Sequence, residues 1–275
     1  MGQLGNAASL IVNARMYSVC PAAKEAWQTL IRWVMRRAGV DWRFFDWDPP
    51  HLLSDLWARG DLGCAMMCGL PYSLREPRAL ILAAPIASPA RYEGRSVYFS
   101  DLAVRADSGY RTLEDTFGGV LGYTLKDSQS GYFALRHHLL PLERNGPLPY
   151  RAIVGNLMNP KGVIQALADG RIDVGPLDSY CHDLFRHLEP AFASQVRIVA
   201  TTAPTPMPPV VSTAALDAAT LTAVREAFLA VETASELDPV RAKLVLKGFV
   251  IPEPDDFNVQ KQRAHDVERN GAQWP

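Results

Sequence analysis

The sequence predicts an α/β protein of two lobes, each an α/β sandwich, joined by two hinge crossovers of the chain. Three observations lead to this expectation. Short apolar runs alternate with segments of helical spacing, a pattern typical of βαβ units and a mainly parallel sheet. The chain has 275 residues, which suits two modest domains. Hydrophobic residues make up 48% and charged residues 21%, as expected for a packed globular protein.

The first lobe begins with a short apolar strand and a long amphipathic helix. The strand is expected at residues 9–14. The helix follows Pro21, because Trp27, Leu30 and Val34 recur at helical spacing and Gly39 is suited to end it. The other elements predicted here are helices starting at Asp48 and Gly69 and strands at residues 42–47, 62–68 and 79–84.

The second lobe is predicted to begin within a strand at residues 97–105. The remaining strands are expected at residues 119–125, 150–155, 172–177 and 196–201. Helices of this lobe are expected at residues 132–140 and 161–168 and after Asp178. Two further helices, at residues 217–231 and 238–246, are expected to belong to the first lobe. Pro141 is expected to stop the helix before it, and residues 270–275 are expected to form a loose tail.

The domain organisation follows from two places where the chain crosses between lobes. Residues 1–98 and 209–275 are assigned to lobe 1, which is discontinuous, and residues 99–208 to lobe 2, which is inserted. The proline-rich stretch APTPMPP is too stiff for a flexible linker and suits an extended crossover. The two crossovers together would form a hinge.

A polar turn at a predicted helix start is the strongest functional signal in the chain. Ser128, Gln129, Ser130 and Gly131 separate an apolar strand from the helix that follows. Free backbone N–H groups and the positive end of the helix dipole meet at such a start, and two hydroxyls and an amide add further donors. The turn could therefore hold an anion without a formal charge. The alternative is that a serine only caps the helix.

Composition narrows the classes of partner. With 28 basic and 29 acidic residues the net charge is −1, so neither nucleic acid nor an anionic membrane surface is an expected partner. The four cysteines lack zinc-site spacing, and no metal or cofactor is predicted. Their pattern mildly favours a reducing compartment. The N-terminus lacks the features of a secretory signal, and no stretch is long enough to span a membrane.

Several motifs, in their order and spacing, resemble a known family. They are RGDLGCAMMCGLPY, YFSDLAVRADS, TLED, SQSGYFALRHHLL, ALADGRIDVGPLDSY and IVATTAPTPMPPVV. This order is similar to that of the phosphonate/phosphite-binding periplasmic proteins of ABC transporters, which have the type 2 periplasmic-binding-protein fold. The match runs from about residue 97 to residue 211, and the first ninety residues agree only in architecture.

The resemblance implies specific ligand-binding residues. In that family a Ser/Thr-Ser-Gly-Tyr turn holds phosphonate oxygens, which corresponds to Ser128, Gln129 and Ser130 here, and a tyrosine covering the ligand corresponds to Tyr98. The Asp-Ser-Tyr sequence that follows a strand in that family is present here and begins at Asp178. An acidic residue that often precedes the proline of the second crossover is absent, because Pro208 stands before Pro209. That absence weakens the case for an aminoalkylphosphonate ligand.

Position in the predicted fold supports four candidates, two of which, Tyr98 and Asp178, the resemblance also implies. Asn159 and Asp178 start helices that should point into the cleft, because ligand crevices lie at the carboxyl ends of sheet strands. Tyr17 and Tyr98 are candidate cleft walls, each supplying a flat apolar face and a hydroxyl. The alternatives are N-capping for Asn159 and Asp178 and ordinary packing for the two tyrosines.

The function we expect is that of a solute-binding protein of an ABC-type importer. It would capture a small anionic or polar solute, such as phosphonate, phosphate or phosphite, by hinge closure, as a monomer, with an ABC permease as partner. The resemblance implies a periplasmic location, whereas the lack of a signal favours the cytoplasm. Two alternatives stay open: a cytoplasmic enzyme on the same fold, as in menaquinone or thiamin-precursor synthesis, and a sensory module.

Overall fold

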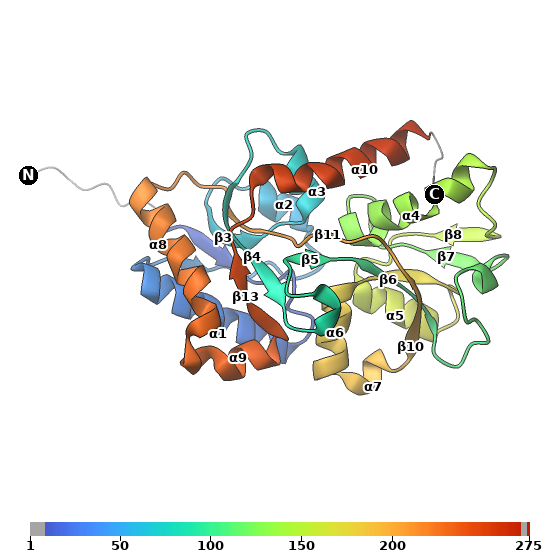
Figure 1. The fold of residues 1–275 in the computed structure, drawn as a ribbon, viewed down its shortest axis with the longest axis horizontal. Helices are drawn as coiled ribbons and strands as arrows, with labels where there is room; N and C mark the ends of the chain where they lie inside the picture. The colour runs from blue at the N-terminus through green and yellow to red at the C-terminus, as the bar shows by residue number, and fades with distance from the viewer. Residues whose placement is uncertain (1–8, 271–273) are drawn as a thin grey trace, which may run out of the picture.

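The computed structural model describes residues 9–270 and 274–275 and places its two largest β-sheets in different halves of the molecule (Figure 1). The larger sheet has the strand order β13-β4-β12-β3-β1-β2. Its strands are β1 (Ile11–Asn13), β2 (Arg43–Phe44), β3 (Leu62–Met66), β4 (Leu80–Ala87), β12 (Val210–Ser212) and β13 (Leu246–Val250). This is the sheet of the first lobe. Strands from both ends of the chain build it, as a discontinuous lobe requires.

Helices cover both faces of the first-lobe sheet (Figure 1). They are α1 (Pro21–Ala38), α8 (Ala218–Leu229) and α9 (Asp238–Lys243) on one face and α2 (Leu53–Ala58) and α3 (Gly69–Leu74) on the other. Trp27, Leu30 and Phe228 are buried in the core under the first group. Trp57 and Tyr72 are buried in the core under the second. The apolar spacing of residues 22–38 therefore predicts the buried face of α1 correctly.

The second-lobe sheet combines two smaller pieces. Strands β10-β6-β9 form one piece and β7-β8 the other, and a bridge between Leu121 and Val174 joins them. The strands are β6 (Ser100–Arg105), β7 (Val120–Gly122), β8 (Ala152–Val154), β9 (Gly175–Asp178) and β10 (Val196–Thr201). The helices around them are α4 (Ala134–Arg144), α5 (Pro160–Ala168), α6 (Ser179–Leu188) and α7 (Pro190–Ala193).

The expectation of a mainly parallel sheet is wrong. Among the named strands, parallel pairing is confined to β1 with β2, β1 with β3 and β7 with β8. β12 runs antiparallel to both β3 and β4, and β13 runs antiparallel to β4. The reason is topological: the chain re-enters the first lobe from the second, so its returning strands meet the earlier ones from the opposite direction.

Two short strands connect the lobes. β5 (Val97–Tyr98) and β11 (Thr205–Pro206) pair antiparallel, with Thr205 opposite Tyr98, and they lie between the two sheets (Figure 1). Each belongs to one of the two predicted crossovers. The exact boundaries at residues 98/99 and 208/209 stay a prediction.

The polar turn leads into a helix, but Pro141 does not end it. Ser128 caps a π-helical turn (Gln129–Phe133) that continues directly into α4. Pro141 lies inside α4, which extends to Arg144. A proline costs one backbone hydrogen bond, and the buried side chains of Leu139 and Leu140 on this helix help to offset that loss.

The C-terminal end is not a loose tail where the structure describes it. Helix α10 (Asn258–Arg269) runs from beside α3 to beside α4, so it spans both lobes (Figure 1). Trp274 is 4% exposed, and its indole N–H donates to Glu143 at 2.7 Å. Packing of one large aromatic side chain against the second lobe therefore overrides the polar composition of the segment. Among the described residues, no helix is both long and apolar enough to cross a membrane.

Candidate functional site

Asp178 is the point at which predicted site residues from both lobes meet. It caps α6, because its Oδ1 accepts the main-chain N–H groups of Tyr180 and Cys181, each at 3.0 Å. Its Oδ2 lies 3.4 Å from the hydroxyl of Tyr17 and 3.5 Å from the hydroxyl of Ser130. Tyr17 follows β1 of the first lobe, whereas Ser130 belongs to the helix start of the second. Capping is therefore only part of what this carboxyl does.

The charge of Asp178 is set by burial. Burial raises its pKa to about 6, and the main-chain N–H groups of Cys181 and Tyr180 only partly offset that effect. The side chain is 6% exposed. The site thus contains a carboxyl group that can change protonation state near neutral pH, and its Oδ2 meets hydroxyls rather than cations.

Gln129 and Tyr98 present buried polar atoms with no hydrogen-bond partner. Both residues are 0% exposed, and the unpartnered atoms are Nε2 and Oε1 of Gln129 and the hydroxyl of Tyr98. Thr205, the strand partner of Tyr98 in the crossover, has an unpartnered hydroxyl as well. An unpaired buried polar group costs about 1–3 kcal/mol. Such a group in a folded protein calls for an explanation, and a bound water, ion or ligand is one.

Cys68 joins this group and was missed by the sequence interpretation. Burial raises the pKa of its thiol to about 11, while the main-chain N–H of Gln129 acts in the opposite direction. Burial, followed by Cys68 and Asp178, also raises the pKa of Tyr98 well above its usual value. Cys68 belongs to the first lobe, and its contact with the main-chain N–H of Gln129 places it against the helix start of the second lobe. Its place just before the Gly-Leu-Pro-Tyr turn was the available signal.

Ser128 and Asn159 act as helix caps. The Ser128 hydroxyl accepts the Gly131 N–H at 3.0 Å, and the Asn159 side-chain oxygen accepts the Gly162 N–H at 3.0 Å. Asn159 is exposed, and the described contacts do not link it to Asp178. The structure brings Tyr17, Tyr98, Gln129, Ser130 and Asp178 together, and a ligand role for Ser128 or Asn159 stays a prediction.

Gly131 fixes the helix start against the strand before it. A Cβ at this position would lie 1.8 Å from the Thr124 hydroxyl, so only glycine fits. The main-chain carbonyl of Ser130 accepts the hydroxyl of Ser100 at 2.7 Å, which ties the turn to β6. These contacts fix the backbone of the turn, and neither of them uses the side-chain polar atoms of Gln129 or Ser130.

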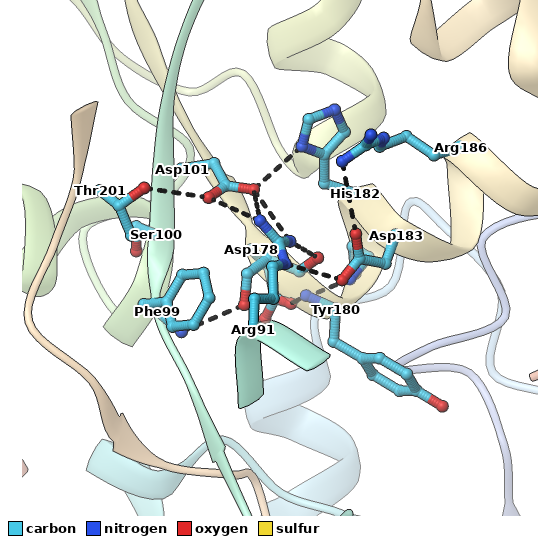
Figure 2. A network of polar contacts seen from close by, with 12 residues as sticks. Arg91, Phe99, Ser100, Asp101, Asp178, Tyr180, His182, Asp183, Arg186 and Thr201 are labelled. Atoms are coloured by element: carbon cyan, nitrogen blue, oxygen red, sulfur yellow. Dashed lines mark hydrogen bonds and ion pairs between the residues drawn. The ribbon is translucent and has the colours of Figure 1, made fainter. Parts of the chain in front are cut away.

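A second polar network lies beside the site and links the lobes (Figure 2). Arg91, which precedes the first crossover, donates from Nη1 to Asp101 of β6 at 3.0 Å and from Nε to Asp183 of α6 at 3.0 Å. It also donates to the main-chain carbonyl of Ser179 at 2.8 Å, directly after Asp178. His182 contacts Asp101 through Nδ1 at 3.0 Å. The sequence interpretation did not identify this network, since its members are far apart in the chain.

Among residues 9–270 and 274–275, no group of three or more His, Cys, Asp or Glu side chains is arranged to hold a metal ion. The polar atoms at the site are instead hydroxyls, an amide, a thiol and one carboxyl group. This set suits a ligand rich in oxygen atoms that both accepts and donates hydrogen bonds.

Comparisons with known proteins agree with the two-lobed fold. A family model described as the periplasmic substrate-binding protein of phosphonate ABC transporters matches residues 21–257. None of the curated proteins searched matches the chain.

Solved structures show the same fold at low identity. A binding-protein component of an ABC phosphonate transporter from Pseudomonas aeruginosa is 17% identical, with a TM-score of 0.79 over 96% of this chain and 87% of that one. PhnD1 from Prochlorococcus marinus, solved with methylphosphonate, is 11% identical, with a TM-score of 0.75 over 95% and 98%. A Xanthomonas citri protein solved with ATP is 23% identical, with a TM-score of 0.65 over 96% and 98%.

Proposed function

Because the chain belongs to the family of periplasmic substrate-binding proteins of phosphonate ABC transporters, we propose that it captures a small oxyanion between its two lobes. The family is one of transport proteins rather than enzymes, and its members deliver a solute to a membrane permease. The ligand we propose is a phosphonate, phosphite or phosphate, held at the start of the helix that follows β7.

The donors for the ligand oxygens are Gln129 and Ser130, together with the Tyr98 hydroxyl. Gln129 and Tyr98 are buried and Ser130 is half-buried, and the Gln129 amide and the Tyr98 hydroxyl lack partners within the protein. The positive end of the helix dipole adds to the attraction. The single observation that carries the proposal is the fully buried Gln129 side chain, both of whose polar atoms are unpaired.

Asp178 selects the protonation state of the ligand. An ionised carboxylate only accepts hydrogen bonds, so it repels a fully ionised oxyanion but accepts a proton from a ligand O–H. A monoanion that keeps one hydroxyl therefore fits this site better than a dianion. Protonation of Asp178 itself, whose pKa is raised to about 6, relieves the same repulsion at lower pH.

Hinge closure follows from the placement of the donors. Tyr17 and Cys68 come from the first lobe, and Gln129, Ser130 and Asp178 come from the second, so contacts with the ligand are complete only when the lobes meet. The paired crossover strands β5 and β11 provide the hinge. The proposed partner is an ABC permease that distinguishes the closed form from the open one.

The test is calorimetric titration of the purified protein with methylphosphonate, phosphite, phosphate and sulfate. We expect saturable binding of at least one phosphorus oxyanion and weaker binding of sulfate, which lacks the proton for Asp178 at neutral pH. A protein that binds none of the four at millimolar concentration does not have the proposed function. Conversion of a bound compound into product would instead support the enzyme alternative.

A further inference from the structure

A hollow of about 370 Å³ opens on the second lobe, and none of the proposed inter-lobe ligand residues lines it. It lies between α6, α7 and the edge strand β10. The lining residues are His182, Arg186, Pro190, Ala193, Ser194, Val196, Arg197 and Ile198. We propose that this hollow is a second binding site, for a small organic anion with an apolar body. The proposal goes beyond the inter-lobe function and does not depend on it.

The charge lining the hollow has one sign. Arg186 and Arg197 contribute guanidinium groups, and no aspartate or glutamate within the described part of the chain lines the hollow. Arg197 is held in place, because its Nη2 donates to the main-chain carbonyl of Ser108 at 3.1 Å and its Nε to that of Ala106 at 3.3 Å. Arg186 is 59% exposed and lies 3.9 Å from Asp183, a contact long enough to leave its donors available.

His182 gives the hollow a buried polar wall. It lies one helical turn before Arg186 on the same face of α6, so both side chains project to the same side. The ring is 3% exposed, and its Nδ1 is 3.0 Å from Asp101. Because an ionised carboxylate only accepts, Nδ1 carries the proton in that contact. The second ring nitrogen points away from Asp101 (Figure 2). It is therefore held in a fixed direction for a ligand.

The rest of the lining determines the kind of anion. Pro190, Ala193, Val196 and Ile198 are apolar and form much of the lining. The volume lies within the usual range for small-molecule sites, about 300–1,000 Å³. An inorganic ion would leave most of it unfilled. The ligand class is therefore a carboxylate or phosphate monoester whose charged end meets the two arginines and whose apolar end meets these side chains.

The experiment uses benzoate as the probe, with the full chain and calorimetric titration. Benzyl alcohol has the same ring without the charge, and acetate has the charge without the ring. We expect saturable benzoate binding and at least about tenfold weaker binding of both comparison compounds, since a charge-assisted contact and apolar burial each contribute. Absence of saturable benzoate binding up to about 10 mM, an affinity near the weak limit for a specific site, overturns the proposal.

Substitutions of the two arginines test whether benzoate binds in this hollow. Arg186→Gln with Arg197→Gln is expected to weaken benzoate binding about tenfold or more, and Arg186→Gln alone about threefold, a change that can be measured even if the double variant does not fold. Arg171→Gln, at an exposed arginine elsewhere on the second lobe, should leave it unchanged. Ser130→Ala should also leave it unchanged. Benzoate binding that is lost in Ser130→Ala and kept in the double arginine variant overturns the proposal by placing the probe in the inter-lobe cleft.

Discussion

Replacing Gln129 with methionine should have opposite effects on stability and on ligand affinity. The Gln129→Met change removes two buried polar atoms that have no partner and keeps a side chain of similar length. Each unpaired group costs about 1–3 kcal/mol, so after allowance for imperfect packing we expect the ligand-free protein to gain about 2 kcal/mol. In a chain of 275 residues this gain corresponds to a rise in Tm of about 4 °C.

Ligand affinity should fall in the same variant. Loss of a hydrogen bond to a buried oxyanion weakens binding by about 1–3 kcal/mol, or roughly 5- to 150-fold. Gln260 provides a comparison, because it is also 0% exposed and its Oε1 is also unpaired, but its Nε2 donates to the Pro206 carbonyl at 3.0 Å. Gln260→Met should therefore raise Tm less than Gln129→Met, because it removes a buried hydrogen bond together with the unpaired oxygen.

The assays for both variants are thermal unfolding without ligand and calorimetric titration with the tightest of the four oxyanions. A lower Tm for Gln129→Met together with unchanged affinity would refute the reasoning. In that case the Gln129 amide would be satisfied within the ligand-free protein, and the residue would be part of the ordinary core.

Three further predictions concern neighbouring groups. Ser130→Ala should weaken oxyanion binding in calorimetry by about 1–3 kcal/mol. Ser128→Ala should instead mainly lower the free energy of unfolding, by about 1 kcal/mol, because the helix loses its cap. Equal oxyanion affinities for both variants and the wild type would mean that Ser130 has only a structural role. Because the folded-state pKa of Asp178, about 6, lies above the ordinary value of about 3.9, stability that this group contributes at low pH should be lost as pH rises from about 4 to 6. Asp178→Asn should thus gain about 3 kcal/mol relative to wild type across that window in urea unfolding; a constant difference would contradict the raised pKa. Arg91→Met should cost about 3–5 kcal/mol by removing the cation that two buried carboxylates share. Arg95→Met, at an exposed ion pair, should cost less than about 1 kcal/mol, and similar losses for the two variants in urea unfolding would argue against the Arg91 network as a link between lobes.

Local patterns predicted the elements that local chemistry determines. The spacing of Trp27, Leu30 and Val34 identified the buried face of α1, and Asp178 was recognised as a helix start. Pro141 was misjudged because tertiary packing of α4 offsets a cost that the sequence shows in isolation. Strand direction was misjudged because short apolar runs do not show from which side the chain enters a sheet.

The site could be predicted only in part, because its residues come from distant parts of the chain and the sequence does not show which of them meet. Tyr17 and Asp178 lie 161 positions apart. Asp178 was proposed from the resemblance and as a helix start, whereas Tyr17 was proposed only as a candidate cleft wall. Arg91 had no sequence feature that suggests a partner in the other lobe, and the only such feature of Cys68 was its place just before the Gly-Leu-Pro-Tyr turn. Trp274 was misread for the same reason, since a polar segment does not reveal that its one large aromatic side chain is buried.

The most direct measurement is a crystal structure of the protein with methylphosphonate. We predict density between the lobes, with phosphonate oxygens within about 3.2 Å of the Gln129 amide and the Ser130 hydroxyl and one oxygen facing Asp178. Contradiction would come from a structure at saturating methylphosphonate in which the Gln129 and Tyr98 side chains stay packed against protein atoms alone and the ligand is bound elsewhere or not at all.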